Sequence, residues 1–127
     1  MPKSQMPNSD LMSPILRFES GARMSQAVVA NGFIFLAGQV ADDPSKDVED
    51  QTRQVLAEID RLLAAAGADK RRILTATVYL ADIGDFAAMN RAWDAWVAQD
   101  AKPARATIEA ALAAPEYRVE IQVTALA

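Results

Sequence analysis

The chain has 127 residues, of which 51% are hydrophobic and 24% are charged, a composition typical of one folded domain rather than a disordered segment. It contains no cysteine and no histidine, which excludes disulfides, thiolate or histidine catalysis, and Cys or His metal ligands. The formal net charge of -4 argues against a nucleic-acid partner, since nucleic-acid binders present a basic face. Any chemistry must rest on carboxylates, arginine, hydroxyls, backbone groups and bound water.

The first 14 residues carry three prolines among polar residues and are predicted to form a flexible extension. A single domain is expected over residues 15–127. No apolar run approaches the roughly 18 residues of a membrane span, and no basic region precedes an apolar core as in a secretory signal. We therefore expect a cytoplasmic protein without a membrane partner.

The periodicity of the domain predicts three strands, a helix, a strand, a helix and two strands. Asn31-Gly32 suits a tight hairpin turn, because both central positions of a type I′ turn need positive φ. Asp47 is a predicted N-cap and Gly67 a predicted C-terminal cap of the first helix, and the second helix stops before Pro103. The predicted strands cover residues 15–19, 25–30, 33–40, 73–80, 104–111 and 117–125.

This order predicts an α+β fold, a two-layer sandwich in which a six-stranded mixed sheet carries both helices on one face. Each helix has an apolar stripe, and in the second helix Trp93 and Trp96 belong to that stripe and are expected in the core. The other sheet face stays uncovered, which favours oligomerisation through it.

Arg105 is the first candidate for chemistry, because alanines flank it on both sides and leave room around its guanidinium. The strand period of two places Arg105, Thr107 and Glu109 on one face. The guanidinium fork matches a carboxylate or phosphate in bidentate geometry, so one interpretation is an anion site. The alternative is a strand-end arginine paired with a neighbouring carboxylate, which composition alone favours.

Glu120 is the second candidate, since the period of the last strand points it away from the apolar layer. If the last two strands are antiparallel neighbours, Glu120 lies near the Arg105 strand and can position water or transfer protons. The alternative is an ordinary cross-strand ion pair, which the residues alone favour.

Seven segments, in order along the chain, resemble the RidA family, also called YjgF-like and, in older labels, endoribonuclease L-PSP. These segments are 25–28, 37–39, 51–52, 63–67, 85–90, 103–105 and 119–121. The resemblance runs from about Gly21 to the C-terminus. It implies a chorismate-mutase-like fold and a homotrimer with clefts between adjacent subunits.

The resemblance also implies an activity, the hydrolytic deamination of reactive 2-imino or 2-enamino acids to 2-keto acids and ammonia. In similar members the arginine matching Arg105 binds the substrate carboxylate, Glu120 is the candidate carboxylate that activates water, and the backbone around Thr107 helps to hold water or nitrogen. No metal and no cofactor are implied, because the imine is already electrophilic and needs only orientation, a water and proton transfer.

The chain departs from the best-characterised branch of the family at three matching positions. Met24 stands where a tyrosine is usual, Ala37 where a serine is usual, and Thr107 where a cysteine is frequent. The loss of two hydroxyls makes the pocket more apolar and keeps a second function open, a non-catalytic trimer that binds small carboxylates. A third function, endoribonuclease or translation inhibitor, follows the older label, and the acidic charge argues against it.

Overall fold

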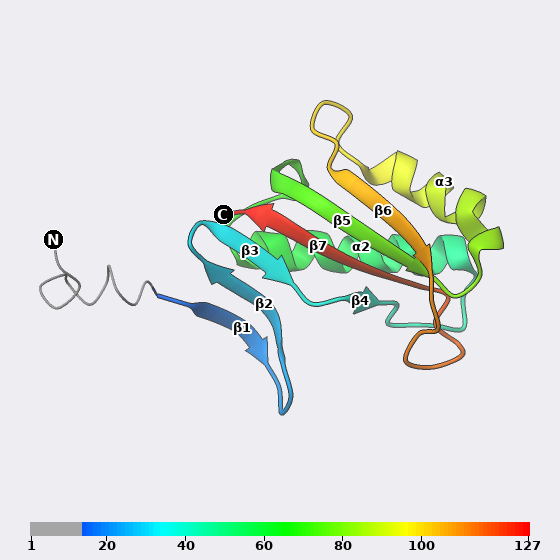
Figure 1. Ribbon diagram of the computed structural model, residues 1–127, viewed down its shortest axis with the longest axis horizontal. Coiled ribbons are helices and arrows are strands. Elements are labelled where there is room, and N and C mark those ends of the chain that lie inside the picture. Colours follow the sequence, from blue (N-terminus) through cyan, green and yellow to red (C-terminus); the bar gives the residue numbers. More distant parts are fainter. Residues whose placement is uncertain (1–13) are drawn as a thin grey trace, which may run out of the picture.

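The computed structural model describes residues 14–127 and contains a mixed sheet, two α-helices and two short 3-10 helices (Figure 1). The strands are β1 (Leu16–Ser20), β2 (Ser25–Ala30), β3 (Phe33–Leu36), β4 (Gln39–Val40), β5 (Ile73–Leu80), β6 (Ala104–Glu109) and β7 (Val119–Leu126). The helices are α2 (Val48–Ala65), η1 (Lys70–Arg72), η2 (Ile83–Asp85) and α3 (Phe86–Trp96). The predicted extension over residues 1–14 lies almost wholly outside the described residues.

The sheet has the strand order β1-β2-β3-β7-β5-β6, and β4 pairs separately with β7. The pairs are antiparallel except for β5 and β6, which run parallel. A parallel pair needs a crossover, and α3 supplies it. The last strand of the chain, β7, is therefore a central strand, and β6 is an edge strand.

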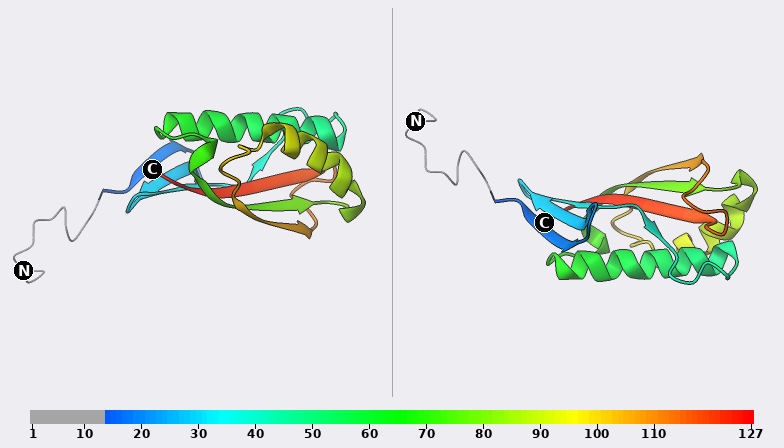
Figure 2. Two further views of the ribbon diagram at one scale, coloured as in Figure 1. Left: turned by 90° about the horizontal axis from the view of Figure 1, so that it is seen from above. Right: turned by 90° about the horizontal axis from the view of Figure 1, so that it is seen from below.

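Both helices cover the same face of the sheet, as the two views of Figure 2 show. The predicted stripe of α2 is buried, and so is the alternate row of β7 that faces it. Residues fully or almost fully buried in this layer include Val55, Leu56, Ile59, Leu62, Leu63, Val119, Ile121, Val123 and Ala125. The predicted two-layer α+β sandwich is confirmed.

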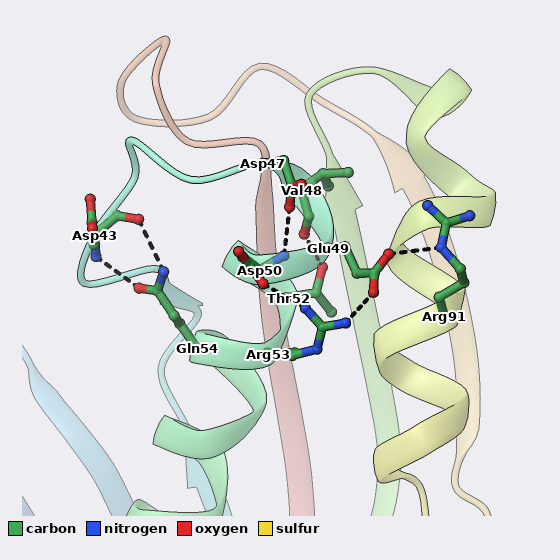
Figure 3. Close-up of polar contacts among 9 residues, drawn as sticks. All are labelled: Asp43, Asp47, Val48, Glu49, Asp50, Thr52, Arg53, Gln54 and Arg91. Carbon is green, nitrogen blue, oxygen red and sulfur yellow. Dashed lines mark hydrogen bonds and ion pairs between the residues drawn. The ribbon is translucent and has the colours of Figure 1, made fainter.

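The N-terminus of α2 is fixed by polar contacts that also connect it to α3 (Figure 3). The Asp47 side chain accepts a hydrogen bond from the Asp50 backbone N–H, as predicted for an N-cap. Glu49 accepts a hydrogen bond from Arg91 on α3 at 2.7 Å and also pairs with Arg53. The hydrogen bond from Arg91, together with the neighbouring guanidiniums, lowers the pKa of Glu49. This contact fixes α3 beside the first turns of α2.

The cap and turn predictions that depend on positive φ are also confirmed. Asn31 and Gly32 have φ values of 53° and 79°, as the hairpin between β2 and β3 requires. Gly67 follows α2 with φ of 84°, the left-handed conformation that ends many helices.

Two details of the predicted sheet are wrong. The strand predicted over residues 33–40 breaks at Ala37 and Gly38, so the sheet has seven strands instead of six. The last two strands are not neighbours, because β5 lies between β6 and β7 and pairs with both. Local periodicity sets which face a residue occupies but not which strands pair, and here the crossover inserts β6 at the edge.

The sheet face opposite the helices carries several exposed apolar side chains. Phe33, Phe35, Leu74 and Ile108 are each between 38% and 46% exposed. A patch of large apolar side chains on a sheet face is typical of a surface that another chain covers. No helix among residues 14–127 has the length and apolar character needed to cross a lipid bilayer.

Candidate functional site

The edge strand β6 lies beside α3 (Figure 1), and Arg105 lies on its helix-covered side. Its register partner on β5 is Ala76, which is 3% exposed and belongs to the core row. The guanidinium carbon lies 4.9 Å from the ring centre of Trp93 and 5.8 Å from that of Phe86. Nη1 donates a hydrogen bond of 2.8 Å to the Oδ1 atom of Asn90. The half-buried cation is therefore held by three side chains of α3.

Within residues 14–127, no carboxylate lies in ion-pair range of the Arg105 guanidinium. Burial lowers the pKa of Arg105, and the more distant carboxylate of Asp94 opposes this only in part. The alternative prediction, a strand-end arginine neutralised by a neighbouring glutamate, is thus wrong for the described part of the chain. A desolvated cation without a carboxylate partner is suited to bind an anion from outside the chain.

Thr107 and Glu109 share the face of Arg105, as the strand period predicts. Thr107 is partly buried and pairs in register with Val78, another core residue. Glu109 accepts a hydrogen bond of 2.9 Å from the Ile83 backbone N–H, so it holds the turn before α3. Thr107 therefore carries a hydroxyl two residues from Arg105 on the same face of β6.

Glu120 lies on the opposite face of the sheet. Its register partners are Tyr79 on β5 and Val40 on β4, whereas its neighbours Val119 and Ile121 are fully buried on the helix side. A hollow of about 400 Å³ opens beside it, lined by Gly38, Tyr79, Gln122 and residues 110–113. Its carboxylate thus faces an open pocket on the uncovered side of the sheet.

Gly38 brings its backbone directly against Glu120. A Cβ atom on residue 38 would lie 2.9 Å from the Cδ atom of Glu120, closer than real Cβ contacts. A larger residue at this position would displace the Glu120 carboxylate from the place it occupies, which gives a physical reason for glycine in the break between β3 and β4. Glycine at this position therefore keeps the backbone of the break in reach of the carboxylate.

Ala37 lies in the break between β3 and β4, and Met24 directly precedes β2, the strand that pairs with β3. The Ala37 backbone N–H donates to the Gln26 carbonyl at 2.9 Å, and its own carbonyl accepts from the Gln39 side chain. Met24 precedes β2, is 48% exposed, and accepts a hydrogen bond from the Gly21 N–H. Of the predicted site residues, the chain thus brings Ala37 close to Glu120 through Gly38.

The condition under which Glu120 would lie near the Arg105 strand, pairing of the last two strands, is not met within one chain. Arg105 and Thr107 are on the helix-covered face, Glu120 is on the open face, and β5 lies between their strands. The prediction assumed that β6 and β7 were neighbours. Within one chain the two groups of predicted site residues form two separate half-sites.

The α3 residues around Arg105 were not predicted from the sequence as part of a site. Trp93 is 7% exposed and packs in the core as predicted, but it also stacks on the guanidinium. Phe86, at the start of the apolar stripe of this helix, is 42% exposed, and its ring lies beside the guanidinium. Phe86, Asn90 and Trp93 recur at helical spacing, but the spacing alone does not identify an arginine as their partner. Among residues 14–127 there is also no group of three acidic side chains suited to hold a metal ion.

Comparison with known proteins assigns the family. The family model described as Endoribonuclease L-PSP matches residues 15–127. The chain belongs to this family. A RutC family protein from Haemophilus ducreyi is 53% identical, with the match covering 87% of this chain and 95% of the relative. The RutC family protein YoaB of Escherichia coli is 44% identical over 87% of this chain and 96% of its own.

Solved structures of the family agree with this assignment. A member of the YjgF protein family from Neisseria meningitidis superposes with a TM-score of 0.87 at 52% identity, covering 89% of this chain and 94% of its own. A structure described as a putative endoribonuclease L-PSP from Entamoeba histolytica superposes with a TM-score of 0.76 at 31% identity, covering 88% and 94%. The resemblance to the RidA or YjgF-like family predicted from the sequence is confirmed.

Proposed function

We propose that this protein hydrolyses 2-imino acids and their 2-enamino tautomers to 2-keto acids and ammonia, with Arg105 binding the substrate carboxylate. The observation that carries the proposal is the Arg105 guanidinium, half-buried against Trp93 without a carboxylate partner among residues 14–127. A substrate carboxylate supplies the missing negative charge and matches the planar fork in bidentate geometry. The resemblance to family members with this activity supports the same assignment.

Glu120 supplies the second half of the chemistry. Its carboxylate accepts a proton from a water molecule as the water oxygen bonds to the C2 carbon of the imine. Glu120 passes this proton to the imine nitrogen, which gives the carbinolamine. The carbinolamine hydroxyl then releases its proton to Glu120, which passes it to the nitrogen as the C2–N bond breaks, so that ammonia leaves and the C2–O bond becomes a carbonyl. The imine carbon is electrophilic from the start, so orientation, one water and one proton-transferring group are sufficient.

The position of the half-sites on opposite sheet faces favours a site between two copies of the chain. Arg105 of one copy would meet Glu120 of the next across the open sheet face, where Phe33, Phe35 and Ile108 are exposed. Covering these side chains gives the contact a hydrophobic contribution. We therefore propose a homotrimer with a cleft at each subunit contact, as the resemblance implies.

A second candidate function is a carboxylate-binding trimer without turnover. It is motivated by Met24 and Ala37, which remove two hydroxyls from the Glu120 side of the site but leave Arg105 unchanged. It predicts binding of 2-keto acids without acceleration of imine hydrolysis. The net charge of -4 argues against an endoribonuclease function, because RNA is itself negatively charged.

A coupled assay tests the proposal. An amino-acid oxidase generates 2-imino acids, and the formation of 2-keto acid is followed with wild type, Arg105→Ala and Arg61→Ala. The last variant is the matched control, since Arg61 is an exposed arginine paired with Glu19. We expect acceleration by wild type and Arg61→Ala and its loss in Arg105→Ala. A wild-type rate in Arg105→Ala contradicts the proposal, and no acceleration by wild type favours the binding function.

A further inference from the structure

We infer that Asn90 is a positioning residue that fixes the rotation of the Arg105 guanidinium and reserves its Nε–Nη2 edge for the substrate carboxylate. The inference rests on the proposed function, because it concerns the anion that Arg105 binds. It adds a residue to the site and predicts the edge on which the carboxylate docks.

One face of α3 surrounds the Arg105 guanidinium. Phe86, Asn90 and Trp93 follow one another at spacings of four and three residues, so they share one face of the helix. That face meets Arg105 with two rings and one amide between them. The hydrogen bond from Arg91 to Glu49 connects the neighbouring position to α2 (Figure 3), and the buried Met89 and Trp93 orient this part of the helix toward the sheet.

The nitrogen atoms of the Arg105 guanidinium differ in their hydrogen-bond partners. Nη1 donates to Asn90 Oδ1 at 2.8 Å and contacts the Met89 sulfur at 3.9 Å. Within residues 14–127 the guanidinium makes no hydrogen bond through Nε or Nη2. A guanidinium can bind a carboxylate in bidentate fashion through the Nη1–Nη2 edge or through the Nε–Nη2 edge. Asn90 takes one hydrogen of Nη1, and the Nε–Nη2 edge has no partner among residues 14–127.

The side chain of Asn90 carries no charge, so it leaves the positive charge of Arg105 unneutralised. Arginine has no acceptor, so the atom of Asn90 that faces Nη1 must be the amide oxygen. An amide oxygen orients the cation without neutralising it, whereas a carboxylate in the same place would compete with the substrate. Asparagine at this position is therefore suited to hold an arginine that still has to bind an anion.

The test compares Asn90→Asp and Asn90→Ala with wild type, using calorimetric binding of pyruvate as the probe and KM against kcat in the coupled assay. Asn90→Asp keeps the side-chain shape and places a carboxylate on Nη1. We expect it to weaken pyruvate binding and raise KM by about tenfold or more, with a smaller change in kcat. Asn90→Ala leaves the positive charge of Arg105 free and removes only the hydrogen bond that orients its guanidinium. We therefore expect a smaller increase of KM in this variant. Asn31→Asp adds the same charge at the β2–β3 turn and serves as the matched control.

The outcomes separate this inference from the proposed function. Wild-type protein that neither binds pyruvate nor accelerates imine hydrolysis contradicts the proposed function itself. Pyruvate binding by Asn90→Asp equal to that of wild type overturns the role of Asn90, and so does equal weakening by both variants, which would indicate packing alone. If Asn90→Asp does not fold, an unchanged KM in Asn90→Ala overturns the inference.

Discussion

Two arginines at opposite edges of the sheet have opposite surroundings. At the β1 edge, Arg61 on α2 makes two hydrogen bonds of 2.8 and 2.9 Å to the Glu19 carboxylate and also pairs with Glu58. These carboxylates raise the pKa of Arg61, mainly through the hydrogen bonds that Arg61 donates to Glu19. At the β6 edge, Arg105 is held by rings and an amide, and burial lowers its pKa.

The two arginines therefore differ in role: Arg61 connects two elements of the structure, and Arg105 is suited to bind a ligand. Arg61 has its charge neutralised on both sides, and it connects the β1–β2 hairpin to α2 across the surface. Arg105 has no such neutralisation among the described residues and keeps hydrogen-bonding atoms free for a ligand. The same side chain thus stabilises structure where carboxylates surround it and offers an anion site where neutral groups do.

The largest expected difference between the two arginines is in catalysis. Arg105→Lys keeps the charge but loses the planar fork, so we expect kcat/KM for imine hydrolysis to fall by about tenfold or more. Arg61→Lys makes the same chemical change at the other edge and is expected to leave kcat/KM unchanged. The measurement is the coupled oxidase assay on both variants. Equal losses in the two variants would contradict the distinction, as would full activity in Arg105→Lys.

A smaller expected effect concerns stability in acid at the Arg61 edge. The hydrogen bond from Arg61 lowers the pKa of Glu19 below its ordinary value of 4.5. A carboxylate with a lowered folded-state pKa contributes stability above the ordinary value and loses it as the pH falls through the lowered pKa. We therefore expect Arg61→Ala to have a slightly lower urea midpoint than wild type at pH 7. The deficit should shrink as the pH falls from 4.5 through the lowered pKa of Glu19, and a deficit that stays as large in acid as at pH 7 would contradict this origin.

Much of the fold could be predicted from the sequence, because it depends on local rules. The Asn31-Gly32 turn, the Asp47 cap, the Gly67 helix end and the buried row of β7 follow from φ requirements and periodicity. The face on which Arg105 lies relative to Thr107 followed from the same period of two. The pairing of β6 with β5 and the break at Gly38 did not follow from these rules.

The site was harder to predict, because it depends on contacts between distant segments. Arg105 and Glu120 were identified, but their position on opposite faces follows from the insertion of β5 between β6 and β7, which no local pattern encodes. Asn90 and Phe86 were seen only as helix positions, since nothing in their spacing indicates the strand they will face. The close approach of Gly38 to Glu120 likewise appears only after folding.

The most direct test of the proposed shared site is complementation between two inactive variants. Arg105→Ala and Glu120→Gln each remove one half-site, so each alone is expected to be inactive in the coupled assay. Random mixed trimers, formed by co-expression, would contain intact clefts in which Arg105 comes from one subunit and Glu120 from its neighbour. Statistical mixing then predicts recovery of about a quarter of the wild-type activity. No recovery in verified mixed trimers would contradict a site shared between subunits.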